Sequence, residues 1–275
     1  PARGGRSPAG RGWRGSPRRP SGSEGGRCRG LTTTGAGARR LDPALTEHAT
    51  GALLVRGHGY VAPRPLAAAL ALAAQRRGAT LAPTPVLGID QTASGVTLRT
   101  PDGIVRADVV VIAAGSWSSS LTPATATWVR PIRGQLVHLH ASSRPASRVL
   151  WSTGCYVVPW RDGSVLVGAT VEDVGFDEHA TAGGIQRLLA AAMELLPALE
   201  AARVEEIRVG LRPMTADELP AIGPSSTLRN VFYATGHYRS GVLLAPLTAQ
   251  LVADLVLEGR ERPESSLVRP ARLGL

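Results

Sequence analysis

Apolar and polar residues alternate along the middle of the chain. Residues 134–140, 155–160 and 164–170 each follow a period of two, and the turn-forming residues 161–163 (RDG) separate the last two segments. Such alternation is typical of strands with one face in a core and the other in water. The pattern therefore predicts an antiparallel sheet in this part of the chain.

Other strands are predicted by short apolar runs. Residues 108–117 form a continuous apolar run that closes on glycine, which indicates a strand buried on both faces. Residues 96–100 and 104–106 flank a Pro-Asp-Gly turn and predict a hairpin. Four more strands are expected at residues 51–56, 79–82, 204–210 and 231–234.

Three segments carry helical signals, namely residues 65–77, 185–196 and 242–257. The first is rich in alanine, with proline in its first turn and glycine after its end. The third follows a glycine-bounded turn at residues 236–241. A helix that starts in this way presents unpaired backbone N–H groups and a positive dipole end, which suit an anionic or electron-rich ligand. We therefore expect a cofactor in front of this turn.

Length and composition indicate a globular chain. Its 275 residues are 43% apolar, which allows one large domain or two smaller ones with a substantial core. The longest apolar run, residues 242–257, falls short of the roughly 18 uninterrupted apolar residues of a membrane span and contains Pro246, Gln250 and Asp254. No membrane partner is implied.

The net charge of +10 is concentrated at the N-terminus. Residues 1–40 hold ten arginines and one acid, Glu24, which leaves only +1 for the rest of the chain. The same segment contains eleven glycines and four prolines, a composition that predicts a disordered leader. An arginine tail that binds RNA is an alternative, but a translated non-native frame or a start-site artefact fits the composition better, and no nucleic-acid partner is expected.

Cysteine and histidine give no support for a metal site. Cys28 and Cys155 are the only cysteines, so neither a disulfide framework nor a cysteine metal cluster is indicated, and a reducing cytoplasm fits best. His138 and His140 share one face of a predicted strand but lack a third ligand nearby in the sequence.

Two motifs of other enzyme classes fail in their details. Residues 35–40 lack the last glycine of a dinucleotide-binding turn, because position 40 is arginine, and they follow predicted disorder. Residues 57–62 follow a predicted strand, but prolines intervene before the next helix and no acid lies about 20 positions on, so we interpret them as a turn. Ser116 is not in a nucleophile elbow.

Three side chains are candidates for a binding site. Arg212 ends an apolar strand, and its planar fork suits a substrate carboxylate, although an ion pair with Asp217 or Glu218 is the alternative. Tyr156 either closes a pocket or only packs. His237, inside the glycine-bounded turn, either lines the site or supports the turn.

Several stretches taken together resemble the D-amino acid oxidase family of flavoenzymes, and within it the glycine oxidases most closely. The resemblance runs from about Leu41 to Gly259. It rests on residues 155–159 (CYVVP), 167–170 (VGAT), 210–213 (GLRP), 220–223 (PAIG) and 236–246 (GHYRSGVLLAP).

The resemblance implies non-covalent FAD and assigns residues to it. Val86 would lie near the adenosine, and Gly115 and Trp117 would close the strand beside it. The isoalloxazine would lie against the turn formed by Gly236, His237, Tyr238, Arg239, Ser240, Gly241 and Val242. As catalytic residues, Arg212 would clamp the substrate carboxylate, Tyr156 would help to close the pocket, and Arg239 would contact the substrate from the flavin side.

The implied reaction is oxidative deamination of glycine or a small amino acid. Hydride passes from the α-carbon to the flavin, an imine forms, and O2 is reduced to H2O2; in the family the glycine imine can feed thiamine thiazole formation. Sarcosine oxidase-like or D-amino acid dehydrogenase-like activity is an alternative, as is a truncated, non-catalytic remnant. The absence of any cysteine after Cys155 argues against a covalently attached flavin.

The implied fold class is α/β in the mixed α+β sense. A three-layer FAD-binding domain would use residues 62–127 and 209–260, and a substrate domain with an antiparallel sheet would use residues 41–61 and 128–208, followed by a frayed tail at 261–275. The strand–glycine turn–helix unit with which the family begins is not found upstream of Leu41. We therefore expect the FAD-binding domain to be incomplete and the chain to be truncated. A homo-oligomer is compatible with this interpretation.

Overall fold

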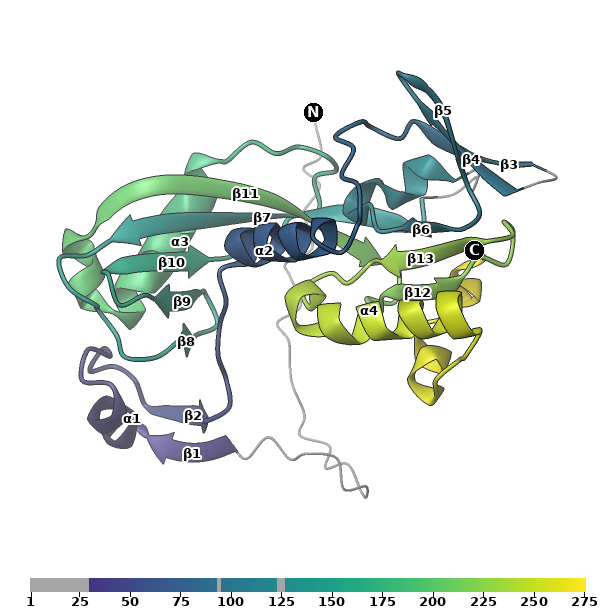
Figure 1. The fold of residues 1–275 in the computed structure, drawn as a ribbon. Coiled ribbons are helices and arrows are strands. Elements are labelled where there is room, and N and C mark those ends of the chain that lie inside the picture. The colour runs from purple at the N-terminus through teal and green to yellow at the C-terminus, as the bar shows by residue number, and fades with distance from the viewer. Residues whose placement is uncertain (1–29, 93–94, 123–126) are drawn as a thin grey trace, which may run out of the picture.

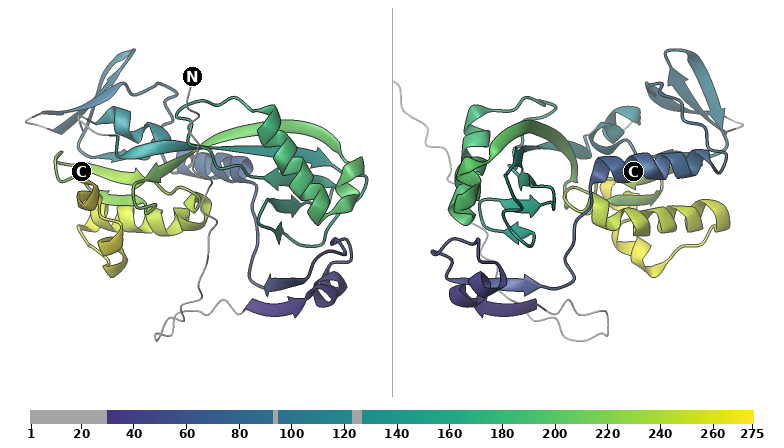
Figure 2. Two further views of the ribbon diagram at one scale, coloured as in Figure 1. Left: turned by 180° about the vertical axis from the view of Figure 1, so that it is seen from behind. Right: turned by 60° about the vertical axis from the view of Figure 1, so that its left-hand side comes forward.

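The computed structural model describes residues 30–92, 95–122 and 127–275, so most of the predicted N-terminal leader lies outside the described residues. Two long strands, β7 (Val129–His140) and β11 (Arg203–Thr215), join two lobes of the molecule (Figure 1). They pair antiparallel along their whole length, with a bulge between Val204 and Glu206. Figure 2 shows the two lobes from behind and from the side, with the paired strands between them.

The sheet lobe contains the predicted antiparallel sheet. Its five strands lie in the order β11-β7-β10-β9-β8, with β8 (Leu150–Trp151), β9 (Tyr156–Pro159) and β10 (Ser164–Gly168). The amphipathic helix α3 (Ala182–Leu195) covers one face, followed by a 3-10 turn, η2 (Pro197–Ala201). Inward-facing positions of the alternating strands and of α3 form the core, which includes Val137, Val157, Val165, Val167, Leu188 and Ala192.

The second lobe is built on a smaller sheet. Its strands lie in the order β12-β13-β6, with β12 (Ala221–Pro224), β13 (Val231–Thr235) and β6 (Val110–Ile112), and β6 runs parallel to β13. The core contains Ile112, Val129, Val231 and the fully buried Tyr233. Helices and antiparallel sheets together confirm the mixed α/β class.

Strand β6 differs from its prediction. Val110 and Ile112 are buried, but the intervening Val111 is 42% exposed, so only one face of the strand is covered by described residues. The apolar run predicted burial on both faces, and a run alone does not say which neighbours are present. Within the described residues, β13 is the one strand that pairs with β6.

A three-stranded meander extends from the second lobe. β3 (Gly88–Thr92), β4 (Gly95–Thr100) and β5 (Gly103–Ala107) pair antiparallel, which confirms the hairpin predicted around the Pro-Asp-Gly turn. The strand predicted at residues 79–82 is wrong, because no described strand pairs with that segment. Before it, α2 (Pro63–Gln75) forms near its predicted position, but none of its residues is buried.

The predicted disorder up to residue 40 is wrong for residues 30–40. They form β1 (Gly30–Thr34), which pairs with β2 (Gly51–Val55), and most of α1 (Gly35–Leu41). The Thr34 hydroxyl caps α1 by accepting a hydrogen bond from the Gly37 amide at 3.2 Å. Small residues are needed here, since a Cβ at Gly35 would overlap the Ala49 carbonyl. A strand therefore does precede the glycines of residues 35–40, although position 40 is still arginine.

The predicted frayed tail is also wrong. The chain continues from α4 (Gly241–Glu258) into two 3-10 turns, η3 (Pro263–Leu267) and η4 (Pro270–Leu273). Leu275 is 3% exposed and belongs to the core of the second lobe. Arg272 holds the segment in place through an ion pair with Asp217 at 2.7 Å.

Helix α4 is long and apolar, so its contacts decide how it is interpreted. By length and composition alone it could cross a membrane. However, its Asp254 is buried and forms ion pairs with Arg260 and Arg262 just beyond the helix. These pairs join the end of α4 to the segment that follows it, and contacts with β12 and β13 pack the helix against the second lobe.

Candidate active site

The glycine-bounded turn at residues 236–241 is bound to the end of β11. His237 forms an isolated bridge with Met214, and the Tyr238 amide donates a hydrogen bond to the Pro213 carbonyl at 2.8 Å. Gly236 and Tyr238 both have positive φ angles, of 78° and 47°, which the sharp reversal requires. The turn therefore lies beside the strand end that carries Arg212.

The turn opens directly into α4 without a side-chain cap. Ser240 occupies the N-cap position, but its hydroxyl makes no capping hydrogen bond. The first amides of a helix, here from Gly241 and Val242 onward, have no partners within the helix and carry its positive dipole end. This end of α4 is therefore suited to an electron-rich group.

His237 connects the turn to α4 through a side-chain hydrogen bond. Its Nε2 lies 2.8 Å from the hydroxyl of Thr248, one α4 residue that is itself buried. Burial lowers the pKa of His237 below its ordinary value of 6.5. The imidazole is therefore neutral at pH 7 and positions the turn without adding a charge to it.

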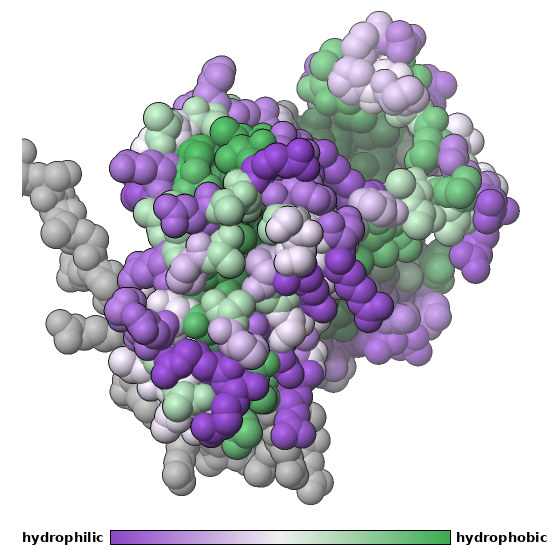
Figure 3. Space-filling view, turned by 90° about the vertical axis from the view of Figure 1, so that its left-hand side faces the viewer, coloured by the Kyte–Doolittle hydropathy of each residue, from purple (hydrophilic) through white to green (hydrophobic). Residues whose placement is uncertain are grey.

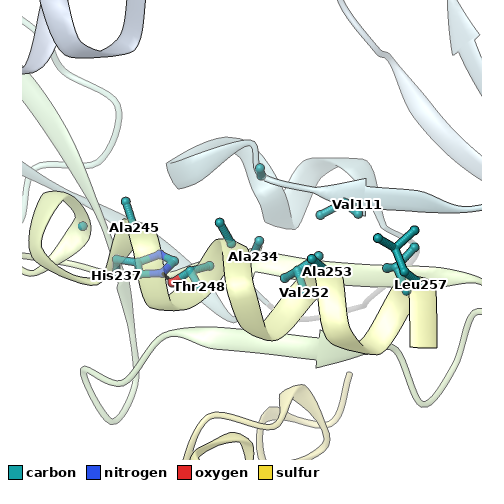
Figure 4. A pocket seen from close by; sticks show the side chains of 12 residues that line it. Val111, Ala234, His237, Ala245, Thr248, Val252, Ala253 and Leu257 are labelled. Atoms are coloured by element: carbon teal, nitrogen blue, oxygen red, sulfur yellow. Dashed lines mark hydrogen bonds between the residues drawn. The ribbon is translucent and has the colours of Figure 1, made fainter. Parts of the chain in front are cut away.

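An apolar groove of about 550 Å³ runs along α4 beside β6 and β13. Figure 4 shows Val111 and Ala234 facing Ala245, Thr248, Val252 and Leu257 across it. Small residues at the end nearest the turn leave it open: Ala113, Ala234, Gly241 and Ala245. Apolar side chains also gather in the hollow beside the sheet lobe, whose outer face is mainly hydrophilic (Figure 3).

Arg212 is partly buried and has no carboxylate partner among the described residues. Its Nη1 donates to the carbonyl oxygens of Thr170, at 3.0 Å, and Arg133, at 3.4 Å. The alternative partner Asp217 is paired with Arg272 instead. Burial, and then the nearby Arg239, lower the pKa of Arg212 from 12.5, as expected for a cation without a counter-ion.

Tyr156 and Arg239 lie close enough to Arg212 to act on it electrostatically. Burial raises the pKa of Tyr156, while Arg212 and Arg239 oppose that rise. The Tyr156 ring lies over Gly168, where a Cβ would be 2.5 Å from its hydroxyl, and its centroid is 5.0 Å from that of Trp151. Strands β9 and β11 and the turn before α4 thus bring the three predicted catalytic residues together.

The residues predicted near the rest of the cofactor are more scattered. Gly115, with φ of 55°, begins the 3-10 helix η1 (Gly115–Leu121), and its carbonyl accepts a hydrogen bond from Thr235 at 3.2 Å. Trp117 is half exposed, with its ring 5.6 Å from Phe176. Val86 packs against the core of the second lobe. None of these three is among the residues that line the groove.

Several residues around Arg212 were missed by sequence reasoning. Arg133 is buried and forms ion pairs with Glu172 and Asp177, both at 2.5 Å. Gly134, next to it on β7, lies under the Arg212 guanidinium. The predicted strand begins at Gly134, so this glycine gave no signal there; only the longer β7 places it inside a strand, where a glycine signals a close approach of another group.

The described residues contain no group of three His, Cys, Asp or Glu side chains that could hold a metal ion, so His138 and His140 acquire no third ligand there. Cys155 is a buried free thiol whose pKa is raised by burial. Cys28 lies outside the described part of the chain.

A family model described as "FAD dependent oxidoreductase" matches residues 9–255. The match starts well before Leu41, so it includes most of the arginine-rich segment that the sequence alone set apart from the family. The bifunctional protein ThiO/ThiG of Nostoc sp. is 40% identical over 234 residues, which cover 83% of this chain and 35% of that protein.

A glycine oxidase of Geobacillus kaustophilus is 39% identical over 234 residues, covering 83% of this chain and 61% of the relative. The crystal structure of glycine oxidase from that organism superposes with a TM-score of 0.81 at 37% identity, over 89% of this chain and 66% of the other. An iminodiacetate oxidase from Chelativorans sp. superposes with a TM-score of 0.80 at 28% identity, over 88% of this chain and 67% of the other. The chain thus spans 35% of the Nostoc ThiO/ThiG protein and 61% of the Geobacillus kaustophilus glycine oxidase, less than two thirds of either relative.

Proposed function

The chain belongs to the FAD dependent oxidoreductase family, whose cofactor is FAD, and we propose that the protein is a glycine oxidase-like enzyme that oxidatively deaminates glycine or another small amino acid. The observation that carries this proposal is Arg212, a partly buried guanidinium beside an uncapped helix end, which is held by two carbonyls and pairs with no carboxylate of the described residues. The ThiO/ThiG and glycine oxidase relatives support the same reaction and a link to thiamine thiazole formation.

The residues at the start of α4 fit a flavin. The groove there is lined by small side chains, and the uncapped amides of Gly241 and Val242 suit the electron-rich edge of a flavin ring. When bound, FAD supplies the hydride acceptor for the substrate α-carbon and the route by which electrons reach O2 to give H2O2. We assign its contacts to the turn at residues 236–242, and to Val86, Gly115 and Trp117 further along the cofactor.

The protein itself supplies binding and orientation. The donors of Arg212 that are not used on the two carbonyls bind the substrate carboxylate as a charge-assisted pair. Arg239 adds a second positive charge, and the raised pKa of Tyr156 keeps its phenol protonated, so it can donate a hydrogen bond. No general base is required if the amine arrives neutral, and water then hydrolyses the imine product.

The central test compares Arg212→Ala with Arg212→Lys in purified protein supplied with FAD. Arg212→Ala is expected to raise KM for glycine by about 100-fold or more, because a hydrogen-bonded charge pair of about 3 kcal/mol is lost. Arg212→Lys keeps the charge but not the fork, so an intermediate KM is expected. Peroxide release measures both variants.

An unchanged KM in Arg212→Ala would rule out the carboxylate clamp. Sarcosine and small D-amino acids in the same assay test the alternative substrates, and an artificial electron acceptor in place of O2 tests dehydrogenase activity. Protein that neither retains flavin nor releases peroxide would favour a non-catalytic remnant. RNA binding that is lost on deletion of residues 1–40 would favour the arginine-tail alternative.

We also place the protein in the cytoplasm, because its two cysteines provide no disulfide framework. Size-exclusion chromatography measures whether it forms a homo-oligomer. A secreted, disulfide-linked product would contradict the cytoplasmic assignment.

A further inference from the structure

Gly134 lies beneath the Arg212 guanidinium, and the backbone conformation at this position does not require a glycine. Gly134 lies in the middle of β7, directly opposite Gly210 on β11, and its φ is outside the left-handed region. An L-residue could therefore adopt its backbone conformation. A Cβ at this position, however, would overlap the guanidinium carbon and both terminal nitrogens of Arg212.

Strand geometry explains the overlap. Residues directly opposite each other in an antiparallel pair point to the same face, and successive residues alternate. Arg212 is paired with Ile132, so its side chain lies on the face shared by Ile132 and Gly134 and reaches diagonally over the glycine. The guanidinium occupies the space that a Cβ at position 134 would fill.

Two carbonyls fix the guanidinium within that space. They belong to Arg133 on β7 and to Thr170, which follows β10. The Arg133 and Glu172 backbones exchange two hydrogen bonds, of 2.8 and 3.0 Å, and the Thr170 hydroxyl accepts one from the Gln135 amide at 2.9 Å. The two acceptors are therefore held at a constant separation.

Buried charges on the opposite face of β7 hold the segment that carries Thr170. The Arg133 side chain is only 4% exposed and pairs with Glu172 and Asp177. Gln135 donates to the same Glu172 carboxylate at 2.7 Å. These contacts clamp residues 170–177 against β7 from the side that does not face Arg212.

We propose that Gly134 is a positioning residue for substrate binding: it lets the Arg212 guanidinium lie flat on β7, with Nη1 on the two carbonyls and its other donors turned toward the substrate carboxylate. The inference rests on the proposed function in one respect, that the ligand of Arg212 is an amino-acid carboxylate. A larger residue at position 134 lifts the guanidinium off its carbonyls and misdirects those donors, without removing the charge.

The chain offers a matched control in Gly210→Ala. Gly210 faces Gly134 across the ladder, and a Cβ there would meet no atom within 4 Å. Both substitutions make the same chemical change in neighbouring strands. Only Gly134→Ala enters the space of the guanidinium.

The first measurement is binding of acetate, a plain carboxylate, by isothermal titration calorimetry. Gly134→Ala is expected to weaken acetate binding by about tenfold, which corresponds to about 1.4 kcal/mol, while Gly210→Ala leaves it unchanged. In turnover, Gly134→Ala should raise KM for glycine by a similar factor with kcat nearly unaltered. Urea midpoints of the two variants check that both remain folded.

The second measurement places Gly134→Ala in an Arg212→Ala background. If Gly134 acts through Arg212, the substitution has no further effect there on acetate affinity or on KM. Equal effects of Gly134→Ala and Gly210→Ala, or an undiminished effect without Arg212, would overturn the proposal. Acetate binding that depends on Gly134 in protein that releases no peroxide would retain the proposal while rejecting the oxidase function.

Discussion

Arg212 is partly buried and pairs with no carboxylate in the described part of the chain, which distinguishes it from the other arginines on the two long strands. Arg130 pairs with Asp173, Arg133 with Glu172 and Asp177, and Arg208 with Glu206. A partly buried guanidinium without such a partner retains part of its desolvation penalty, and a bound anion relieves it. At the scale of the residue, this uncompensated desolvation of the charge is what suits Arg212 to bind an anion.

His237 carries a pH prediction at the same scale. Its folded-state pKa lies below the ordinary 6.5, so the unfolded chain takes up a proton more readily than the native state does. Its contribution to stability is complete above about pH 6.5 and is lost as the pH falls from there through the folded-state pKa.

The pH dependence of stability can be tested with His237→Gln, which keeps a polar side chain but does not titrate. Between pH 8 and pH 5 the urea midpoint of the wild type should fall more steeply than that of the variant. Parallel curves would show that His237 titrates alike in both states and would contradict the assigned burial effect.

Helix α3 depends on a single threonine for its start. The Thr181 hydroxyl accepts hydrogen bonds from the Gly184 amide at 3.2 Å and from the Gln135 side chain at 3.0 Å. The same residue thus caps α3 and connects it to the polar network on β7. At the scale of the element, the Thr181 hydroxyl therefore stabilises both the start of α3 and the polar network on β7 that lies next to Arg212.

Thr181→Ala should therefore lower the free energy of unfolding by about 1 kcal/mol or somewhat more, the usual effect of a lost N-cap. Thr181→Ser retains the hydroxyl and should stay close to wild type. Urea denaturation followed by circular dichroism measures both. Equal losses in the two variants would point to the lost methyl group instead of the cap.

Two hydrophobic cores share the same pair of long strands. Val129, at one end of β7, belongs to the core of the second lobe, while Val137 and Leu139 further along the strand belong to the core of the sheet lobe. Loss of either core therefore removes support from a strand that the other core needs. At the scale of the whole molecule, we expect the lobes to unfold together.

Ile112→Ala in the second lobe and Leu188→Ala in α3 test this coupling. Each removes a fully buried side chain and should lower stability by about 2–5 kcal/mol. Because the strands are shared, each variant should shift a single calorimetric transition. Two separate transitions, with each variant moving only one of them, would show that the lobes are independent.

The local features of this protein could be predicted from its sequence. Period-two alternation identified the strands of the sheet lobe, Pro-Asp-Gly identified the β4–β5 turn, and glycines around residues 236–241 identified the opening of α4. These signals depend on neighbours within a few positions, so the chain itself contains them. Some of these segments, residues 155–159, 167–170 and 236–246, also carried the family resemblance, while the domain bounds and the roles of the site residues stay predictions.

Other features depend on residues that are distant in the sequence. The carbonyl of Arg133 that accepts from Arg212 is 79 positions away. The Leu41 carbonyl accepts a hydrogen bond from Arg148, and the Leu275 carbonyl accepts one from the Ser226 amide, so these contacts also come from remote segments. For this reason the disorder predicted for residues 30–40 and the frayed tail were wrong. The strand predicted at residues 79–82 has no partner strand among the described residues. The composition of a segment does not record what packs against it.

The sequence by itself determined most strands of the sheet lobe, the glycine-bounded turn before α4 and a chemistry suited to a carboxylate, because side-chain type and short-range periodicity express these directly. Only the tertiary structure decided that Asp217 pairs with Arg272, so that no carboxylate of the described residues pairs with Arg212, and that Gly134 lies beneath the Arg212 guanidinium. The first outcome depends on where the C-terminal segment folds back, and the second on the register of β7 and β11. Each is a property of two segments together.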